Sequence, residues 1–148
     1  MAAHSASTPP RRPCGPTVIV VDASVLAPAL VDDGPSGVRA RGRLIGESLA
    51  APELIDLELT SVFRGLTRAK KLTVRRAQDA LVDLAALPLE RAAHRHLIQR
   101  CWELREKLTP YDAAYVTLAE LLAVPLITAD TRLAQAPRIF CQVEVLAP

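Results

Sequence analysis

Aromatic residues are scarce in this sequence and make up only 3% of its 148 residues. Because so few rings are present, a surface that binds RNA mainly by stacking bases on aromatic side chains is excluded, and the core must be aliphatic. Half of the residues are nevertheless hydrophobic, and 23% are charged. This composition predicts one folded domain, and it excludes two large domains or a chain that is disordered throughout.

Cysteines and long apolar segments are also few. The three cysteines, Cys14, Cys101 and Cys141, form no C-x-x-C pair, and their odd number does not suit a disulfide framework. The apolar run that begins at Val18 is broken by Asp22, far short of the roughly 20 residues that a membrane-spanning helix needs. We therefore expect a soluble, cytoplasmic protein with reduced thiols.

The beginning of the chain is rich in proline, which restricts the backbone and removes a hydrogen-bond donor. We predict that residues 1–16 form a disordered extension and that residues 17–148 form the domain. The Arg11-Arg12 pair leaves a twin-arginine export signal as an alternative, although the apolar stretch that follows contains an acid. The net charge of +2 is compatible with nucleic-acid binding but does not establish it.

Strand-like and helix-like segments alternate along the remaining chain. Residues 17–21 (TVIVV) are a β-branched run typical of a strand buried on both faces. Thr109-Pro110 starts a helix, because threonine is a favoured N-cap and proline a favoured first helical residue. Further helices are predicted at 36–49, 53–69, from 73 onward and at 91–107, and short strands at 50–52, 87–89, 125–128 and 142–146. The alternation predicts an α/β fold, with three layers around a mostly parallel central sheet.

Two aspartates directly follow predicted strands, Asp22 after VIVV and Asp130 after LITA. In open parallel sheets, ligands bind beyond the carboxyl ends of the strands. Each aspartate alone also suits a helix cap or an Asx turn. The two together at strand ends therefore indicate a functional site.

Two further carboxylates fall on helix faces that turn inward. Glu58 shares a stripe with Ile55 and Leu59, where an unpaired charge is costly, so it needs either an ion-pair partner or a metal ion. Asp112 lies in the first turn of its helix, which suits capping, but it also shares the inward stripe with Tyr115. Four acids without a nearby histidine or cysteine would form an all-oxygen site. Such a site suits Mg²⁺ or Mn²⁺ and phosphodiester chemistry rather than zinc.

Each of the four acids lies in a recognisable segment: VVDAS (20–24), APELIDLE (51–58), LTPYDAAYVTLAE (108–120) and PLITAD (125–130). These segments resemble the four motifs of PIN-domain ribonucleases of the VapC toxin type. The resemblance extends over about residues 18–146. One departure is Ser61, where the family often has asparagine, and this puts one supporting contact in doubt.

The resemblance implies a Mg²⁺-dependent endoribonuclease, with Mn²⁺ as the alternative metal. It also implies the toxin of a type II toxin–antitoxin pair, which forms a homodimer and is inhibited by a VapB-like antitoxin. The residues that would hold the metal and carry catalysis are Asp22, Glu58, Asp112 and Asp130, with Ser24 and Thr128 hydrogen-bonded to the carboxylates.

Other functions fit the sequence less well. A phosphatase of the haloacid dehalogenase type needs a second aspartate two residues after the first, where this chain has Ser24. A phospho-receiver domain needs an acidic pair before its phosphorylated aspartate and a late lysine, which we do not find. A PIN-like RNA-binding or protein-interaction module without nuclease activity remains the alternative from another class, although the complete set of acids argues against it.

A basic segment follows the helix that carries Glu58. It contains Arg64, Arg68, Lys70 and Lys71. Two interpretations stay open: a solvated surface, or a surface that binds RNA phosphates or an acidic stretch of an antitoxin.

Four ring-bearing residues complete the predictions. His94 and His96 lie two apart on a predicted helix, so they point away from each other, and we expect a solvated face rather than a metal site. Trp102 and Phe140 are expected in the core.

Overall fold

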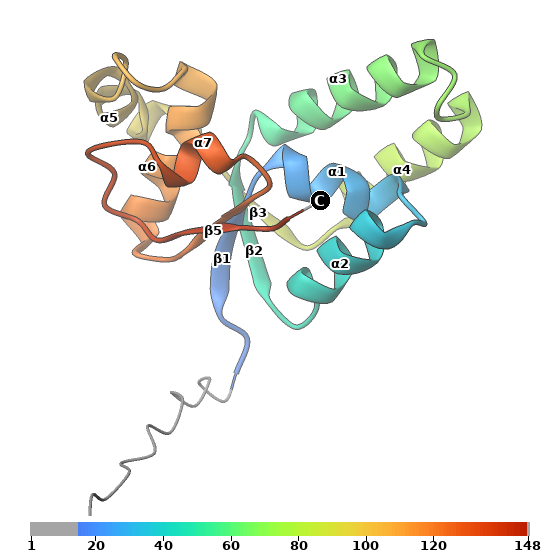
Figure 1. Cartoon of the computed structure of the whole chain (residues 1–148), viewed down its shortest axis with the longest axis horizontal. Helices are drawn as coiled ribbons and strands as arrows, with labels where there is room; N and C mark the ends of the chain where they lie inside the picture. The colour runs from blue at the N-terminus through green and yellow to red at the C-terminus, as the bar shows by residue number, and fades with distance from the viewer. Residues whose placement is uncertain (1–14, 148) are drawn as a thin grey trace, which may run out of the picture.

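Five parallel strands form the centre of the structure, a computed structural model that describes residues 15–147 (Figure 1). Their order across the sheet is β3-β2-β1-β4-β5, and every neighbouring pair is parallel. The predicted α/β class is therefore confirmed. Residues 1–14 of the predicted extension lie outside the described residues. The strands are β1 (Val18–Val21), β2 (Ser48–Pro52), β3 (Leu89–Ala92), β4 (Leu126–Thr128) and β5 (Val143–Val145).

Helices cover both faces of this sheet, which gives the predicted three layers. Figure 1 shows α1, α2, α3 and α4 on one side of the sheet and α5 and α6 on the other. Over residues 15–147, none of the helices is long and apolar enough to cross a membrane. The longer helices are α1 (Ala23–Val31), α2 (Pro35–Leu44), α3 (Ile55–Arg68), α4 (Val74–Ala86) and α6 (Pro110–Leu122). The shorter ones are η1 (His94–His96, a 3₁₀ helix), α5 (Ile98–Glu103) and α7 (Thr131–Ala134).

The core lies on both faces of β1, the central strand. Ile19, Val20 and Val21 are buried, because strands flank this strand on both edges and helices cover both of its faces. Helix α6 packs directly on β1 and β2. Every residue of α6 from Ala113 to Ala119 is buried, which suits its many small side chains. The strands that end at this edge of the sheet, β1 and β4, are therefore anchored in the core.

The start of α6 follows the sequence signal. The Thr109 hydroxyl accepts a hydrogen bond from the Asp112 backbone N–H at 3.2 Å, and Pro110 occupies the first turn. The helix ends before Ala123, which adopts a left-handed conformation with φ of 54°. This geometry fixes Asp112 in the first turn of α6.

Two predicted helices are wrong in extent. The helix predicted to reach residue 49 ends at Leu44, and Gly46, with φ of +79°, turns the chain toward β2. The helix predicted at 91–107 is replaced by the end of β3, by η1 and by the short α5. β3 extends to Ala92 because it pairs with β2, and strand pairing outweighs the local preference of the sequence for helix.

Two aromatic residues that we expected in the core are exposed. Trp102 is 68% and Phe140 is 80% accessible to solvent. Each ring is instead covered by a guanidinium group, Trp102 by Arg105 and Phe140 by Arg100. Such cation–π contacts satisfy a ring at the surface without burying it. The thiols of Cys101 and Cys141 are free, as expected.

Candidate active site

Asp22 is the most buried of the four predicted acids. It directly follows β1 and caps α1, since its Oδ1 atom accepts the Ser24 backbone N–H at 3.1 Å. Burial raises the pKa of the Asp22 carboxyl above its ordinary value, although hydrogen bonds from Ser24 and Thr128 oppose the rise. All of these partners are neutral donors. The charge of Asp22 is therefore hydrogen-bonded but not neutralised.

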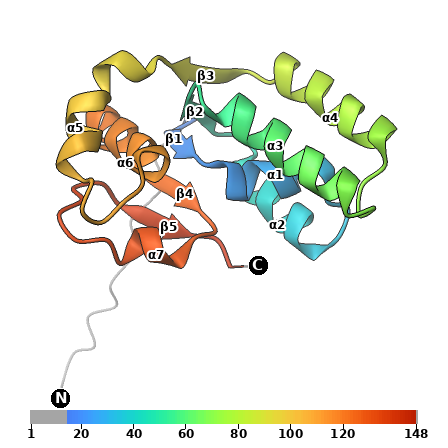
Figure 2. The ribbon, with the colours of Figure 1, turned by 90° about the horizontal axis from the view of Figure 1, so that it is seen from above.

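Two hydroxyl groups fix the Asp22 carboxylate. The Ser24 hydroxyl donates to Oδ1 at 2.5 Å, and the Thr128 hydroxyl donates to Oδ2 at 2.6 Å. In turn, the Ala129 N–H donates to the Ser24 hydroxyl at 2.9 Å, and the Asp130 N–H donates to the Thr128 hydroxyl at 3.0 Å. This network ties the end of β1 to the end of β4. Figure 2, seen from above, shows these strands beside each other at the centre of the molecule.

Glu58 approaches this place from α3. Tyr115, a buried residue of α6, donates a hydrogen bond from its hydroxyl to Glu58 Oε2. Burial raises the pKa of the Glu58 carboxyl; the Tyr115 bond lowers it, and the negative charges of Asp22 and Asp112 raise it further. We expected either an ion pair or a metal ion at Glu58; within residues 15–147 its hydrogen-bond partner is the Tyr115 phenol, and it forms no ion pair. Three acids lie close enough for their charges to interact.

Asp112 is half-buried in the first turn of α6. Its backbone N–H is capped by Thr109, while its carboxylate forms no hydrogen bond within residues 15–147. The charge of Asp112 raises the pKa of both Glu58 and Tyr115. Helix capping is therefore performed by Thr109, and the Asp112 carboxylate is not needed for it.

Asp130 differs from the other three acids because a cation holds it. Its carboxylate caps α7 through the Arg132 backbone N–H, at 2.9 Å, and also pairs with the Arg132 guanidinium, at 2.6 Å from Nη2 to Oδ2. These contacts hold the pKa of Asp130 below its ordinary value. Asp130 thus performs the capping role that an aspartate after a strand often has, and it carries an ion pair besides.

The four acids lie at one edge of the sheet, but their carboxylates do not all converge on a single position. Within residues 15–147, no three carboxylate, imidazole or thiol groups lie close enough together to hold a metal ion. The donor chemistry nevertheless fits a hard divalent cation, because it consists of carboxylate and hydroxyl oxygens. The negative charges of Asp22 and Asp112, which raise the pKa of the Glu58 carboxyl, also indicate an excess of negative charge beside Glu58. The residues present therefore suit such a cation.

Sequence reasoning missed three contacts near the acids. Tyr115 was placed on the inward stripe of α6 without a role, and its bond to Glu58 joins residues far apart in the sequence. The pairing of Arg132 with Asp130 was also missed. His94, expected in solvent, is half-buried, and its Nε2 accepts the Leu54 N–H at 3.1 Å where α3 begins. A histidine that caps a distant helix has no local sequence signal.

A parallel sheet with acids at its carboxyl edge defines the class of this domain, and residues 19–139 match the PIN domain family. Ribonuclease VapC1 of Mycobacterium tuberculosis is 40% identical over 129 residues, which cover 86% of this chain and 96% of the relative. The chain therefore belongs to the PIN-domain family and, within it, to the VapC ribonucleases.

Solved structures have the same fold. The structure of Mycobacterium tuberculosis VapC20, described as a sarcin-ricin loop cleaving toxin, gives a TM-score of 0.62 at 16% identity, covering 80% of this chain and 95% of that one. VapBC-5 of the same organism, a member of the VapBC family of toxin–antitoxin systems, gives a TM-score of 0.55 at 17% identity, with 90% and 100% covered. At these identities the likeness concerns the fold.

Proposed function

We propose that this chain is an endoribonuclease that hydrolyses RNA phosphodiester bonds with Mg²⁺ or Mn²⁺ and acts in the cytoplasm as the toxin of a toxin–antitoxin pair. The observation that carries the proposal is the group of carboxylates at the end of the central strands, where Ser24 and Thr128 hold Asp22 and Tyr115 holds Glu58. The membership in a family of ribonucleases supports it. Asp130 is the fourth acid of this site.

The side chains of this site have distinct tasks in the proposed reaction. Asp22, locked by Ser24 and Thr128, would be the fixed ligand of the metal ion, and Glu58, Asp112 and Asp130 would complete the ligand set. When bound, a divalent cation supplies a Lewis acid that neutralises charge developing on the phosphodiester.

Proton transfer falls to Glu58 in this proposal. A positioned carboxylate can act as a general base, and the Tyr115 hydroxyl binds one of the two Glu58 oxygens, Oε2. Glu58 would take a proton from the attacking water as the new bond from oxygen to phosphorus forms, and the leaving ribose oxygen would take up a proton from solvent as its bond to phosphorus breaks. The Tyr115 hydroxyl keeps the carboxylate oriented during this step.

RNA cleavage under metal control tests the proposal. Purified protein incubated with a structured RNA should produce defined fragments in Mg²⁺ or Mn²⁺ and should stop when the metal is chelated. Cleavage that continues in chelator would contradict the metal-dependent reaction. Binding of RNA without cleavage in either metal would favour the alternative, a PIN-like binding module.

An antitoxin fits a groove beside the acids. Side chains of α1 and α3 line a largely apolar groove of about 690 Å³, which extends from Ser24 to Lys71. Lys71 lines the groove, as does Asp32, and Arg64 and Arg68 are exposed on α3, the helix that also contributes Val62 and Leu66 to the lining. An apolar groove beside exposed basic side chains suits a segment that has apolar and acidic side chains. A VapB-like antitoxin bound here would reach the neighbourhood of Asp22 through Ser24.

Replacing Arg64, Arg68, Lys70 and Lys71 together with Gln should weaken antitoxin binding and flatten its dependence on salt, because charges at the rim of an interface act through screened attraction. Calorimetric titration with the small protein encoded by the adjacent gene, at several salt concentrations, measures both effects. RNA titrated in parallel identifies the other partner that this basic segment could bind. An unchanged salt slope with both partners would mean that the segment is only a solvated surface.

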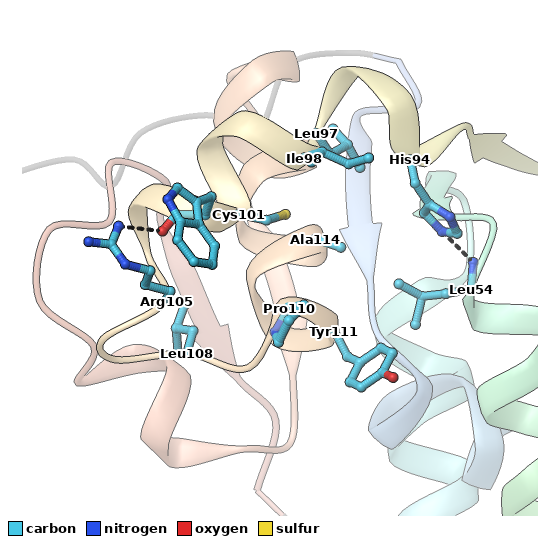
Figure 3. A pocket seen from close by; sticks show the side chains of 11 residues that line it. Leu54, His94, Leu97, Ile98, Cys101, Arg105, Leu108, Pro110, Tyr111 and Ala114 are labelled. Carbon is cyan, nitrogen blue, oxygen red and sulfur yellow. Dashed lines mark hydrogen bonds between the residues drawn. The ribbon is translucent and has the colours of Figure 1, made fainter.

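A second apolar surface, between α5 and α6, suits a second copy of this chain. Exposed side chains of Ile98, Trp102 and Tyr111 surround a largely apolar cavity of about 370 Å³. Figure 3 shows this cavity between α5 and the start of α6, with the Tyr111 ring at one end. A face that has both projecting rings and a cavity can be complementary to itself across a twofold axis. We therefore propose this face, the α5–α6 face, as the homodimer interface.

A Trp102→Ser variant should raise the dissociation constant of the dimer by about tenfold or more, because aromatic residues at the centre of an interface contribute most of its binding energy. Light scattering over a range of concentrations measures the change. Phe140→Ser, which also removes an exposed ring, is the matched control because Phe140 is absent from the lining of the α5–α6 cavity. If Trp102→Ser dimerises as well as the control, this face is not the interface.

A further inference from the structure

One of the four acids, Asp130, already forms an ion pair with an arginine, Arg132. Both oxygens of the Asp130 carboxylate accept from the Arg132 guanidinium: Nη2 lies 2.6 Å from Oδ2, and Nε lies 3.0 and 3.1 Å from the two oxygens. The Arg132 backbone N–H holds Oδ1 separately, at 2.9 Å. The other three acids have no ion pair within residues 15–147.

The exposure of the two side chains is unequal. The Arg132 side chain is 82% accessible to solvent, whereas that of Asp130 is 24% accessible. The arginine therefore covers the carboxylate from the solvent side. The positive charge of the guanidinium also interacts with the negative charge of Asp112.

We propose that Arg132 is an internal counter-cation, which neutralises Asp130 while no divalent ion is bound and releases this carboxylate when one binds. The inference rests on the proposed metal site. A metal ion can use Asp130 only through oxygens that the guanidinium now occupies. Displacement is easy, because ion pairs exposed to solvent are weak.

The backbone contact explains why release need not disturb the site. When the guanidinium leaves, the Arg132 N–H still holds Oδ1 at the start of α7. The carboxylate keeps its position, and Oδ2 becomes available as a metal ligand. Arg132 is thus a positioning residue that sets how readily the site accepts a metal ion.

Calorimetric titration with Mn²⁺ in the absence of RNA tests this inference without measuring activity. Arg132→Gln should bind Mn²⁺ up to about fivefold more tightly than the wild type, the range expected from a solvent-exposed ion pair. Arg132→Lys should lie between the two, because it keeps the charge but loses the two-point contact. Arg75→Gln is the control for lost positive charge. Arg75 is exposed on α4, and its neighbour Arg76 contacts Leu30, at the end of α1 that is remote from Asp22.

The possible outcomes separate this inference from the proposed function. If Arg132→Gln binds Mn²⁺ no more tightly than Arg75→Gln, the counter-cation role is overturned while the metal site stands. If the wild type binds no Mn²⁺ at all, the proposed metal site fails, and this inference fails with it.

Nuclear magnetic resonance gives a second readout on the unmodified chain. The Nε–H signal of Arg132 should move when Mg²⁺ is added, because its hydrogen bond to Asp130 is lost. The Nε–H signal of Arg100, which is bonded to Glu120 at 2.9 Å, is an internal control and should stay in place. An Arg132 signal that does not move at saturating Mg²⁺ would contradict the exchange.

Discussion

An Asp22→Asn variant should fold normally and cleave RNA about a hundredfold or more slowly than the wild type. Asparagine can still cap α1, because its side-chain oxygen can accept the Ser24 N–H. The negative charge on the atom that would bind the metal is lost, however. Charge stabilisation by a metal ion contributes several kcal/mol to the transition state, and each ~1.4 kcal/mol is a factor of ten in rate. Initial rates with a labelled RNA measure the loss.

Asp83→Asn is the matched control for this experiment. Asp83 is an exposed residue of α4, and its replacement removes one negative charge far from the sheet edge. Its rate should equal that of the wild type, and circular dichroism should show that both variants are folded. If Asp22→Asn cleaves RNA as fast as this control, the catalytic site lies elsewhere.

Divalent metal should raise the melting temperature of the wild type by about 10 °C when the ion is present at about a hundredfold excess over its dissociation constant. Binding to the folded state alone contributes RT ln(1 + [L]/Kd), about 2.7 kcal/mol under these conditions, and a domain of this size melts about 4 °C higher per kcal/mol.

Glu58→Gln should reduce this metal-induced rise in the melting temperature. The same variant should be at least as stable as the wild type in chelator, because burial and the neighbouring acids disfavour the Glu58 charge. If Glu58→Gln is instead less stable than the wild type in chelator, and metal does not raise the melting temperature of the wild type, the acids serve as structural caps and ion pairs.

The raised pKa of Asp22 also fixes the sign of a pH effect in the metal-free protein. A carboxyl with a raised pKa in the folded state binds its proton more tightly there, so folding is favoured when the group is protonated. This contribution is lost as the pH rises from the ordinary pKa of 3.8 through the raised folded value. The unfolding free energy of Asp22→Asn relative to the wild type should therefore grow over this interval. Urea unfolding in chelator measures it, and a difference that shrinks as the pH rises would contradict the raised pKa.

The positions of Asp22 and Asp130 could be predicted because they follow from local patterns. A β-branched run predicts a buried strand, and parallel strands end at one edge, so an aspartate after each strand must lie there. The start of α6 was equally predictable from Thr109 and Pro110. In each case the information lies within a few residues of the chain.

The contacts that were missed depend either on segments far apart in the sequence or on the conformation of one side chain. The bond from Tyr115 to Glu58 requires α6 and α3 to lie on either side of the end of β1. The pairing of Arg132 with Asp130 requires a particular side-chain conformation at the start of α7. Trp102 was expected inside because it is apolar, but an apolar residue can remain exposed when a cation or a partner covers it.

Crystals of the protein soaked in Mn²⁺ and measured at the manganese absorption edge would locate the metal ion directly. The proposed function predicts an anomalous peak within bonding distance of an Asp22 carboxylate oxygen and of at least one oxygen from Glu58, Asp112 or Asp130. A peak bound at another part of the surface, or no peak at Mn²⁺ concentrations that support cleavage, would contradict a metal-dependent site at the ends of β1 and β4.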